Sequence, residues 1–334
     1  MVKTEFNFIL LLHLSRSGST YLARHLAENC SDLAVISETN YFRVLLAHQK
    51  IHKKYQPKKL ALLIKEDPKF KNFQFSDKEI LEALQTCENH KEAIISITEM
   101  ILHKLGVKGV MNILIKDGGL VDFIPEVTAL FPNIKIIHIK RDPRGCINSL
   151  LHTPKSFNKG RSSMGWDDIA LCVTQYQDFM AKINKIEGTG KTMLPVIYEN
   201  LVADKEAVIK NAISYLELQP CAKDKNRSKN FLRKQEHIIH KNIYKPVQKE
   251  RTTAWQYELK RWEIIYIESK LKAFIPEPTI KQNNFSAMVS LFRARINHIA
   301  GIFKLTVYRI KRYLLTGNLS MFFLKLKLRL ARDD

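Results

Sequence analysis

Five short apolar runs divide the first two thirds of the chain. They cover residues 6–14, 33–36, 110–115, 134–139 and 193–198, and they show no regular alternation of apolar and polar positions. Continuous apolar runs of this length are typical of strands that are buried on both faces, as in a parallel sheet. The pattern therefore predicts five buried strands.

Helical patterns separate these runs. Ser76 and Glu79 predict a capping box at the start of one helix, and an apolar stripe over residues 91–105 ends at Gly106. The longest helical pattern covers residues 166–186. Strands that alternate with helices indicate an α/β fold, with a central parallel sheet flanked by helices.

Charge adds a second module to this picture. The 334 residues include 54 Lys and Arg but only 33 Asp and Glu, which gives a formal net charge of +21. Residues 281–334 contain eleven basic and two acidic residues, so this part alone carries +9. We predict a body of residues 1–280 and a basic tail of residues 281–334. The excess of positive charge indicates an anionic partner: nucleic acid, a membrane surface or a phosphorylated ligand.

The turn after the first apolar run has the composition of an anion-binding site. A helical pattern follows it directly, and the amide groups and dipole at a helix N-terminus attract anions. The GxxxxGK[ST] phosphate-binding pattern is absent, because the turn has one Gly and no Gly-Lys pair. Alternatively, the segment is only a Ser-rich turn with helix caps. Its candidate ligands are Arg16, Ser17, Gly18, Ser19 and Thr20.

A second candidate anion site follows the fourth run. Arg141 ends this run, Pro143 suits the first position of a helix, and Ser149 lies about two turns further along. Arg141 and Ser149 can hold one phosphate from two sides, and Arg144 can reach it from the first helical turn. Alternatively, Arg141 and Asp142 form only a local ion pair.

In this order, the two motifs resemble those of the sulfotransferases that use 3′-phosphoadenosine 5′-phosphosulfate (PAPS). The resemblance covers roughly residues 5–275 and implies the P-loop-like sulfotransferase fold. It implies that residues 16–20 hold the 5′-phosphosulfate and that Arg141 and Ser149 hold the 3′-phosphate. Tyr198 matches the late strand and turn of the family. Lys245-Pro246-Val247 resembles its closing loop, where Arg251 is the expected contact.

The resemblance also implies catalytic residues. Lys116 matches the Lys that the family places beside the transferring group, and Glu38 fills the place of the Glu in the bacterial carbohydrate and tyrosylprotein branch. Gly118 stands where aryl and steroid sulfotransferases have a His. We expect Glu38 to take the proton of the acceptor hydroxyl, while Arg16 and Lys116 neutralise the leaving phosphate oxygen.

Several questions stay open from the sequence. His152 and Asp117 are alternative bases, and a P-loop-like kinase or a basic nucleic-acid-binding protein are alternative functions. We expect no nucleic-acid partner and no metal, because neither a recognition pattern nor metal-ligand spacing is present. The basic segments 40–110 and 153–165 favour a glycan as the hydroxyl-bearing acceptor. The five cysteines have no CxxC spacing, which suits a reducing compartment.

The tail has the pattern of a basic amphipathic helix. Met288, Leu291, Ile299, Phe303 and Ile310 recur at helical spacing among basic residues, and residues 324–330 alternate Leu with Lys or Arg. Such a helix suits an anionic lipid surface; alternatively, its apolar stripe packs on the body and its charges face water. No apolar run is long enough to span a membrane. We expect a cytoplasmic protein at the inner face of the membrane.

Overall fold

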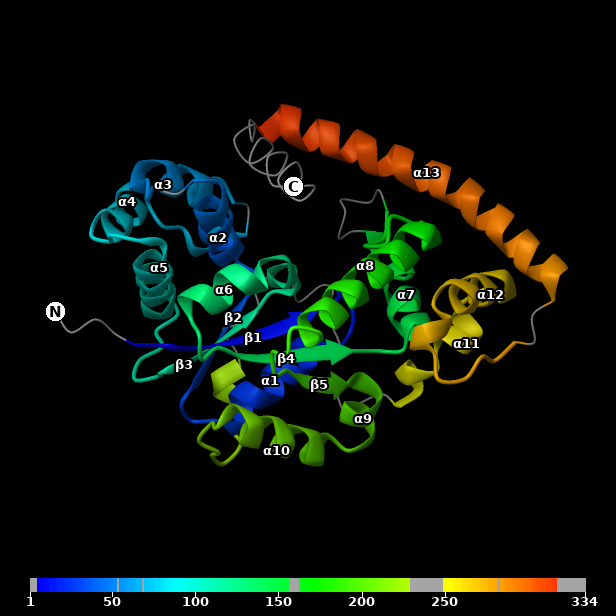
Figure 1. The fold of residues 1–334 in the computed structure, drawn as a ribbon, viewed down its shortest axis with the longest axis horizontal. Coiled ribbons are helices and arrows are strands. Elements are labelled where there is room, and N and C mark those ends of the chain that lie inside the picture. Colours follow the sequence, from blue (N-terminus) through cyan, green and yellow to red (C-terminus); the bar gives the residue numbers. More distant parts are fainter. Residues whose placement is uncertain are drawn as a thin grey trace.

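Five parallel strands form a single sheet in the computed structural model (Figure 1). The model describes residues 5–52, 54–67, 69–155, 162–228, 249–280 and 283–316, with residues 309–316 as backbone only. The strand order is β2-β3-β1-β4-β5. All five predicted strands are confirmed, each within two residues at either end. Their bounds are β1 Asn7–His13, β2 Leu33–Ser37, β3 Asn112–Lys116, β4 Lys135–Lys140 and β5 Leu194–Ile197.

β1 is the central strand, and its position decides where the site lies. It pairs with β3 on one side, where Leu11 lies beside Lys116, and with β4 on the other, where His13 lies beside Ile139. Every pairing in the sheet is parallel. The carboxyl ends of all five strands therefore meet at one edge, where α/β proteins bind their ligands.

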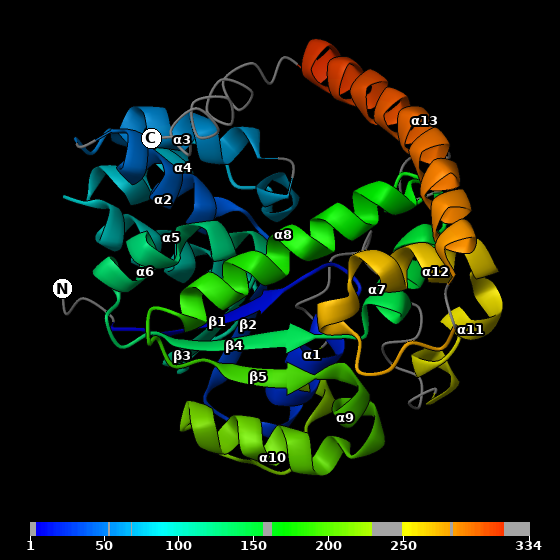
Figure 2. The ribbon, with the colours of Figure 1, turned by 45° about the vertical axis from the view of Figure 1, so that its right-hand side comes forward.

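Helices cover both faces of this sheet (Figures 1 and 2). α1, α9 and α10 lie on one face, and the other helices lie on the opposite face or beyond the sheet. The first seven helices are α1 Ser19–Asn29, α2 Tyr41–Ile51, α3 Pro57–Glu66, α4 Asp77–Gln85, α5 His90–Lys104, α6 Ile124–Leu130 and α7 Pro143–Leu151. The others are α8 Ile169–Glu187, α9 Tyr198–Ala203, α10 Lys205–Leu216, α11 Trp255–Glu258, α12 Arg261–Lys270 and α13 Asn284–Thr316.

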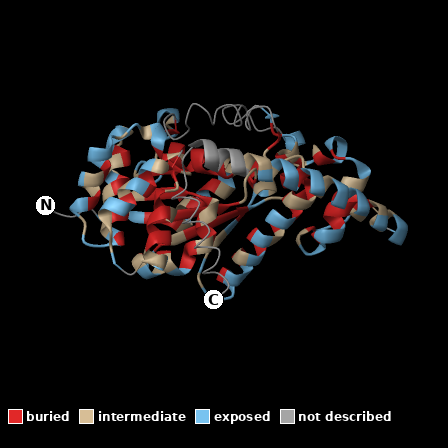
Figure 3. Ribbon diagram, turned by 90° about the horizontal axis from the view of Figure 1, so that it is seen from above, coloured by how far each residue is buried: buried red, intermediate tan, exposed pale blue. Residues whose placement is uncertain are grey.

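The core consists of two apolar clusters, one on each face of the sheet. Alternate residues of β1 enter different clusters: Leu10 and Leu12 contribute to one, and Ile9 and Leu11 contribute to the other. Buried residues are accordingly concentrated around the sheet, while the outer helices carry the exposed ones (Figure 3). A strand buried on both faces has no polar side, which is why its sequence is continuously apolar.

The structure confirms one helix start and corrects another. α4 follows the predicted capping box, in which the side chains of Ser76 and Glu79 bond to each other's backbone amides. The prediction that a helix begins at residue 166 is wrong, because Trp166 and Asp167 have left-handed backbone conformations, with φ of 59° and 56°. Asp168 then caps α8 by accepting a hydrogen bond from the amide of Leu171.

The described part of the tail is one long helix. α13 packs on α8 and α12 at the outside of the molecule (Figures 1 and 2). The side chain of Ile310 and residues 324–330 lie outside the described residues. The division into a body and a tail at residue 280 stays a prediction. Within the described ranges, no helix combines the length and the apolar character needed to cross a bilayer.

His138 gives a test of this core. It lies in β4 with 2% of its surface exposed, and neither ring nitrogen has a hydrogen-bond partner among the described residues. Burial lowers its pKa to about 4, below the ordinary value of about 6.5 that it regains on unfolding. The unfolded chain therefore binds the proton more readily, and His138 makes folding less favourable as the pH falls from 6.5 to 4.

We expect His138→Leu to remove this loss. Relative to the parent chain, the free energy of unfolding of the variant should rise by about 2 kcal/mol between pH 7 and pH 5. Urea denaturation at the two pH values measures the difference, with the exposed His103→Leu as the control. A difference between variant and parent that does not change with pH would contradict the assignment.

Candidate active site

Gly18 fixes the shape of the turn between β1 and α1. Its φ is 96°, which side chains rarely allow, and a Cβ atom at this position would lie 2.3 Å from Cδ2 of Tyr198. Tyr198, which follows β5, therefore contacts the turn at Gly18, where only a glycine leaves enough room for its ring. The hydroxyl-bearing residues beside it, Ser17, Ser19 and Thr20, are all buried.

Arg16 and Arg141 form the positively charged centre of the site. Nε of Arg16 donates to Oγ of Ser149 at 3.0 Å, and Nη1 of Arg141 donates to the carbonyl of Arg16 at 3.1 Å. The Arg141 guanidinium stacks on the ring of Tyr198, 4.4 Å from its centroid. Burial and the neighbouring Arg141 lower the pKa of Arg16 below its ordinary value. Two guanidinium groups held this close favour an anion between or beside them.

Arg251 contacts this centre through its backbone. Its carbonyl accepts from Nη2 of Arg141 at 2.8 Å, while its own guanidinium pairs with Glu258 at 2.8 Å. Glu258 also accepts from the side chain of Asn148 on α7. The structure thus places Arg251 beside Arg141, with its charge directed to Glu258. Lys245-Pro246-Val247 lies outside the described residues.

Arg144 has a structural role, contrary to the hypothesis that it reaches a phosphate. It is buried, and its guanidinium pairs with Asp142 and Glu268 at 2.7 and 2.8 Å. It also stacks on Trp255, 4.1 Å from the ring centroid. These contacts connect α7 to α11 and α12. Of the two arginines, Arg141 therefore remains the candidate for binding a phosphate. Arg141 and Asp142 are not the local pair that we considered, because Asp142 is bound to Arg144.

A second charged group lies at the ends of β2 and β3. Oε1 of Glu38 accepts from Nζ of Lys116 at 2.9 Å, and its Oε2 accepts from Nζ of Lys69 at 2.8 Å. The amide of Glu38 also bonds to the carbonyl of Lys116. Lys116 itself is only 2% exposed. The structure therefore brings together two of the three predicted catalytic residues.

The protonation of this group follows from its contacts. Burial alone would raise the pKa of Glu38, but Lys116 and Lys69 outweigh it and hold that pKa well below its usual range. His13 lies 3.6 Å from the carboxylate, and burial together with Lys116 lowers its pKa to about 4. At neutral pH Glu38 is ionised and His13 is neutral.

The alternative bases occupy different surroundings. Asp117 is buried and accepts a 2.7 Å bond from Arg43, while its other oxygen accepts from the amide of Gly119. His152 is exposed at the end of α7, where its ring bonds to the carbonyl of Asn148. Glu38, at the strand edge beside Lys116, therefore remains the best-placed candidate base.

Sequence reasoning missed Lys69 and Arg43. Lys69 lies 31 residues after Glu38, and Arg43 lies 74 residues before Asp117. Neither belongs to a local motif, and the only signal was the basic character of the segment 40–110. Their positions depend on how α2 and the end of α3 pack beside the sheet.

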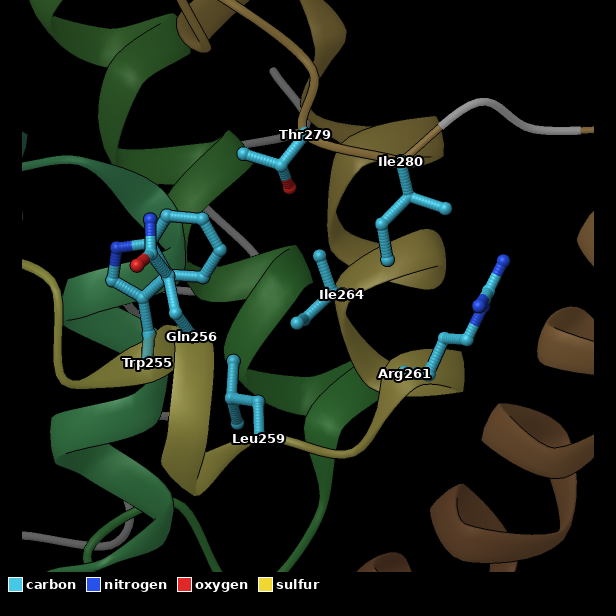
Figure 4. A pocket seen from close by; sticks show the side chains of 7 residues that line it. All are labelled: Trp255, Gln256, Leu259, Arg261, Ile264, Thr279 and Ile280. Atoms are coloured by element: carbon cyan, nitrogen blue, oxygen red, sulfur yellow. The ribbon is translucent and has the colours of Figure 1, made fainter.

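A cavity lies between α11, α12 and residues 279–280. Its volume is about 310 Å³, and its lining is mostly apolar. Figure 4 shows its lining residues Trp255, Gln256, Leu259, Arg261, Ile264, Thr279 and Ile280. None of the candidate site residues is among them. In the ranges that the structure describes, no group of three or more His, Cys, Asp or Glu side chains is placed to hold a metal ion.

Comparison with known proteins identifies the family. The sequence pattern of the sulfotransferase family matches residues 9–222, which include every candidate site residue except Arg251. A search of the curated proteins found no match.

One solved structure supports the fold, and two others show a weaker likeness. The sulfotransferase domain of the curacin biosynthetic pathway has a TM-score of 0.51 and 15% identity, and the alignment covers 82% of this chain and 100% of that one. The sulfotransferase domain of the Synechococcus PCC 7002 olefin synthase has a TM-score of 0.49 and 17% identity, with 83% and 98% covered. A Mycobacterium avium sulfotransferase has a TM-score of 0.43 and 13% identity, with 80% and 76% covered.

Gly18→Ala tests the contact between the turn and Tyr198. The added Cβ would occupy a left-handed conformation and collide with the ring, so the free energy of unfolding should fall by about 2 kcal/mol or more. Urea denaturation measures the loss.

Gly188→Ala is the matched control, because its φ is −62° and no atom lies closer than 3.4 Å to the added Cβ. Its effect should stay within about 1 kcal/mol. Equal losses for the two variants would show that the contact with Tyr198 places no constraint on position 18.

Proposed function

Because the chain belongs to the sulfotransferase family, we propose that PAPS is the donor of the sulfuryl group that it transfers and that a hydroxyl-bearing molecule is the acceptor. The observation that carries this proposal is the joint position of Arg16, Ser149 and Arg141 at the edge of the sheet. Two cations beside a buried, hydroxyl-rich helix N-terminus suit a ligand with several negative charges.

The residues present fit such a ligand. Oγ of Ser17 and Nε of Arg141 are buried, and neither has a hydrogen-bond partner among the residues that the structure describes. Buried donors of this kind are normally satisfied by a ligand or by water. A phosphate or sulfate oxygen can accept from both types of group.

Each part of the nucleotide has its proposed residues. Residues Arg16 to Thr20 hold the 5′-phosphosulfate, with the α1 N-terminus behind them. Arg141 and Ser149 hold the 3′-phosphate, beside Tyr198 and the backbone of Arg251. The guanidinium of Arg251 can add to this group only if it leaves Glu258.

The proposed chemistry rests on charge and position. PAPS supplies the sulfuryl group and leaves as the 3′,5′-bisphosphate. Glu38 takes the proton of the acceptor hydroxyl, since it is ionised at neutral pH and partly exposed. Lys116 and Arg16 stabilise the negative charge that develops on the leaving oxygen. Lys116 already lies within hydrogen-bond reach of Glu38, so the base and this cation share one small region.

We propose a glycan as the acceptor. Lys69 and Arg43 add positive charge next to Glu38 and Asp117, which suits a polar or acidic sugar. The five cysteines are all unpaired, which supports a cytoplasmic, reducing location as part of the same proposal. Incubation with labelled PAPS and a panel of glycans, tyrosyl peptides and small phenols tests donor and acceptor together. Transfer from PAPS to a peptide or a phenol but to no glycan would contradict the acceptor class, and failure to bind PAPS would contradict the donor.

Arg141→Ala tests the 3′-phosphate assignment. A charged hydrogen bond contributes about 1.5–3 kcal/mol, so binding of 3′,5′-bisphosphoadenosine should weaken by about ten- to a hundredfold. Binding of adenosine 5′-phosphate should weaken much less. Titration calorimetry measures both, with the exposed neighbour Lys140→Ala as the control. Equal losses for the two nucleotides would mean that Arg141 does not hold the 3′-phosphate.

Glu38→Gln tests the base. The amide keeps the shape of the side chain but cannot take a proton, so turnover should fall by about 10² to 10⁴ while PAPS affinity stays nearly intact. In the parent enzyme, kcat/KM should fall on the acid side of its pH profile with a pKa below the ordinary Glu value of about 4.3. The reason is that the two lysines lower the pKa of Glu38. Asp117→Asn is the comparison variant. If it loses the turnover and Glu38→Gln does not, the base is Asp117.

A further inference from the structure

α13 attaches to the body through small residues. Ser290 and Ala294 are each 1% exposed. About two turns after Ala294 on the same face, Gly301 lies so close to Asp168 that a Cβ atom would be 2.4 Å from the Cβ of that residue. Close approach of this kind fixes which side of α13 faces α8.

Polar contacts complete this attachment. The side chain of Asn297 accepts from the amide of Ile169, and His298 bonds to Asp168 at 2.8 Å. Lys304 pairs with Asp167 at 2.9 Å. Hydrogen bonds and ion pairs therefore hold α13 at the start of α8, and Leu291 and Ala294 add apolar contacts with the core.

The opposite side of α13 is apolar and exposed. Seven of the eleven large apolar side chains that are exposed in the described residues lie on this helix, each 47% to 72% exposed. They recur at intervals that place them on one side of a helix with 3.6 residues per turn. We call them the outer stripe: Phe285, Met288, Phe292, Ile296, Ile299, Ile302 and Phe303.

This orientation corrects one sequence-based alternative. The apolar stripe was expected either to meet a lipid surface or to pack on the body. The structure describes four side chains of the predicted stripe: Leu291 packs against the core, whereas Met288, Ile299 and Phe303 are exposed. Packing on the body therefore does not account for the apolar residues of α13.

Exposed cations lie within and beside the outer stripe. At about 100° per residue, Arg293 and Arg295 lie on either side of Phe292, and both are exposed. Residues 281–332 contain no acidic residue that could neutralise them. An apolar stripe with one cation within it and another beside it suits the boundary between the acyl chains and the anionic headgroups of a bilayer.

We propose that α13 docks the protein on an anionic lipid surface through the outer stripe. A second copy of the chain fits less well, because two stripes in contact would bring Arg293 and Arg295 of both copies together without acidic partners. Nucleic acid would neutralise the arginines but leave the seven apolar side chains in water. A lipid surface satisfies both features.

Vesicle co-sedimentation of the full-length chain tests the proposal. The parent chain should bind vesicles of phosphatidylcholine with 30% phosphatidylglycerol, less strongly at high salt, and bind pure phosphatidylcholine weakly. Arg293→Gln with Arg295→Gln should weaken binding to the anionic vesicles by about 30-fold, since each cation contributes about 1 kcal/mol. Phe292→Glu with Ile299→Glu should weaken it at least tenfold at both salt concentrations.

Leu62→Glu is the matched control, because Leu62 is a 58% exposed apolar residue on α3, away from the stripe. It should bind as the parent does. Thermal unfolding and binding of 3′,5′-bisphosphoadenosine should be unchanged in every variant, which separates loss of docking from loss of the fold or of the nucleotide site.

Three outcomes would overturn the proposal. The first is a parent chain that binds neither kind of vesicle. The second is a Phe292→Glu, Ile299→Glu variant that sediments as the parent does. The third is a concentration-dependent dimer, seen by analytical ultracentrifugation without lipid and abolished by the same two substitutions, which would assign the outer stripe to a second copy.

Discussion

Arg141 joins the segments from which the site is built. Its guanidinium donates to the carbonyls of Arg16 and Arg251 and stacks on Tyr198, so the segments after β1 and β5 and the segment before α11 all meet at one side chain. These three partners are uncharged, and the neighbouring guanidinium of Arg16 repels it. A guanidinium in such surroundings is most favourable when an anion is bound. The contacts of Arg141 that shape the turn therefore also favour an anion at this position.

The two charged groups of the site differ in how their charge is balanced. Around Arg16 and Arg141 the positive charge is in excess, whereas Glu38 lies between Lys116 and Lys69 and has a depressed pKa. A carboxylate with so low a pKa is a weak base. Any interaction that draws Lys116 toward a negative charge elsewhere weakens its hold on Glu38 and makes the carboxylate more basic. The pairing of Lys116 with Glu38 thus links the proposed donor side of the site to the proposed acceptor side.

The sequence predicted what local patterns determine. Strands buried on both faces are continuously apolar, so all five could be found, and the turn at Gly18 could be read from its composition. The start of α8 could not, because Trp166 and Asp167 adopt a backbone conformation that their side chains do not favour. Lys69 could not be found either, since it lies three residues beyond the end of α3 and reaches Glu38 only in the folded chain. A residue whose position depends on a contact with a distant part of the chain has no local sequence pattern that would reveal it.

The tail shows the same limit for a helix whose pattern was clear. Periodicity revealed an apolar side of α13 but not which side the body would take, because that choice depends on surfaces elsewhere. Asp168 decides it: the carboxylate caps α8 and bonds His298, and its closeness to Gly301 excludes any larger residue at that position. Because α13 is attached through the opposite side, its apolar side stays exposed to solvent. Its exposure follows from specific contacts on the opposite side and not from poor packing.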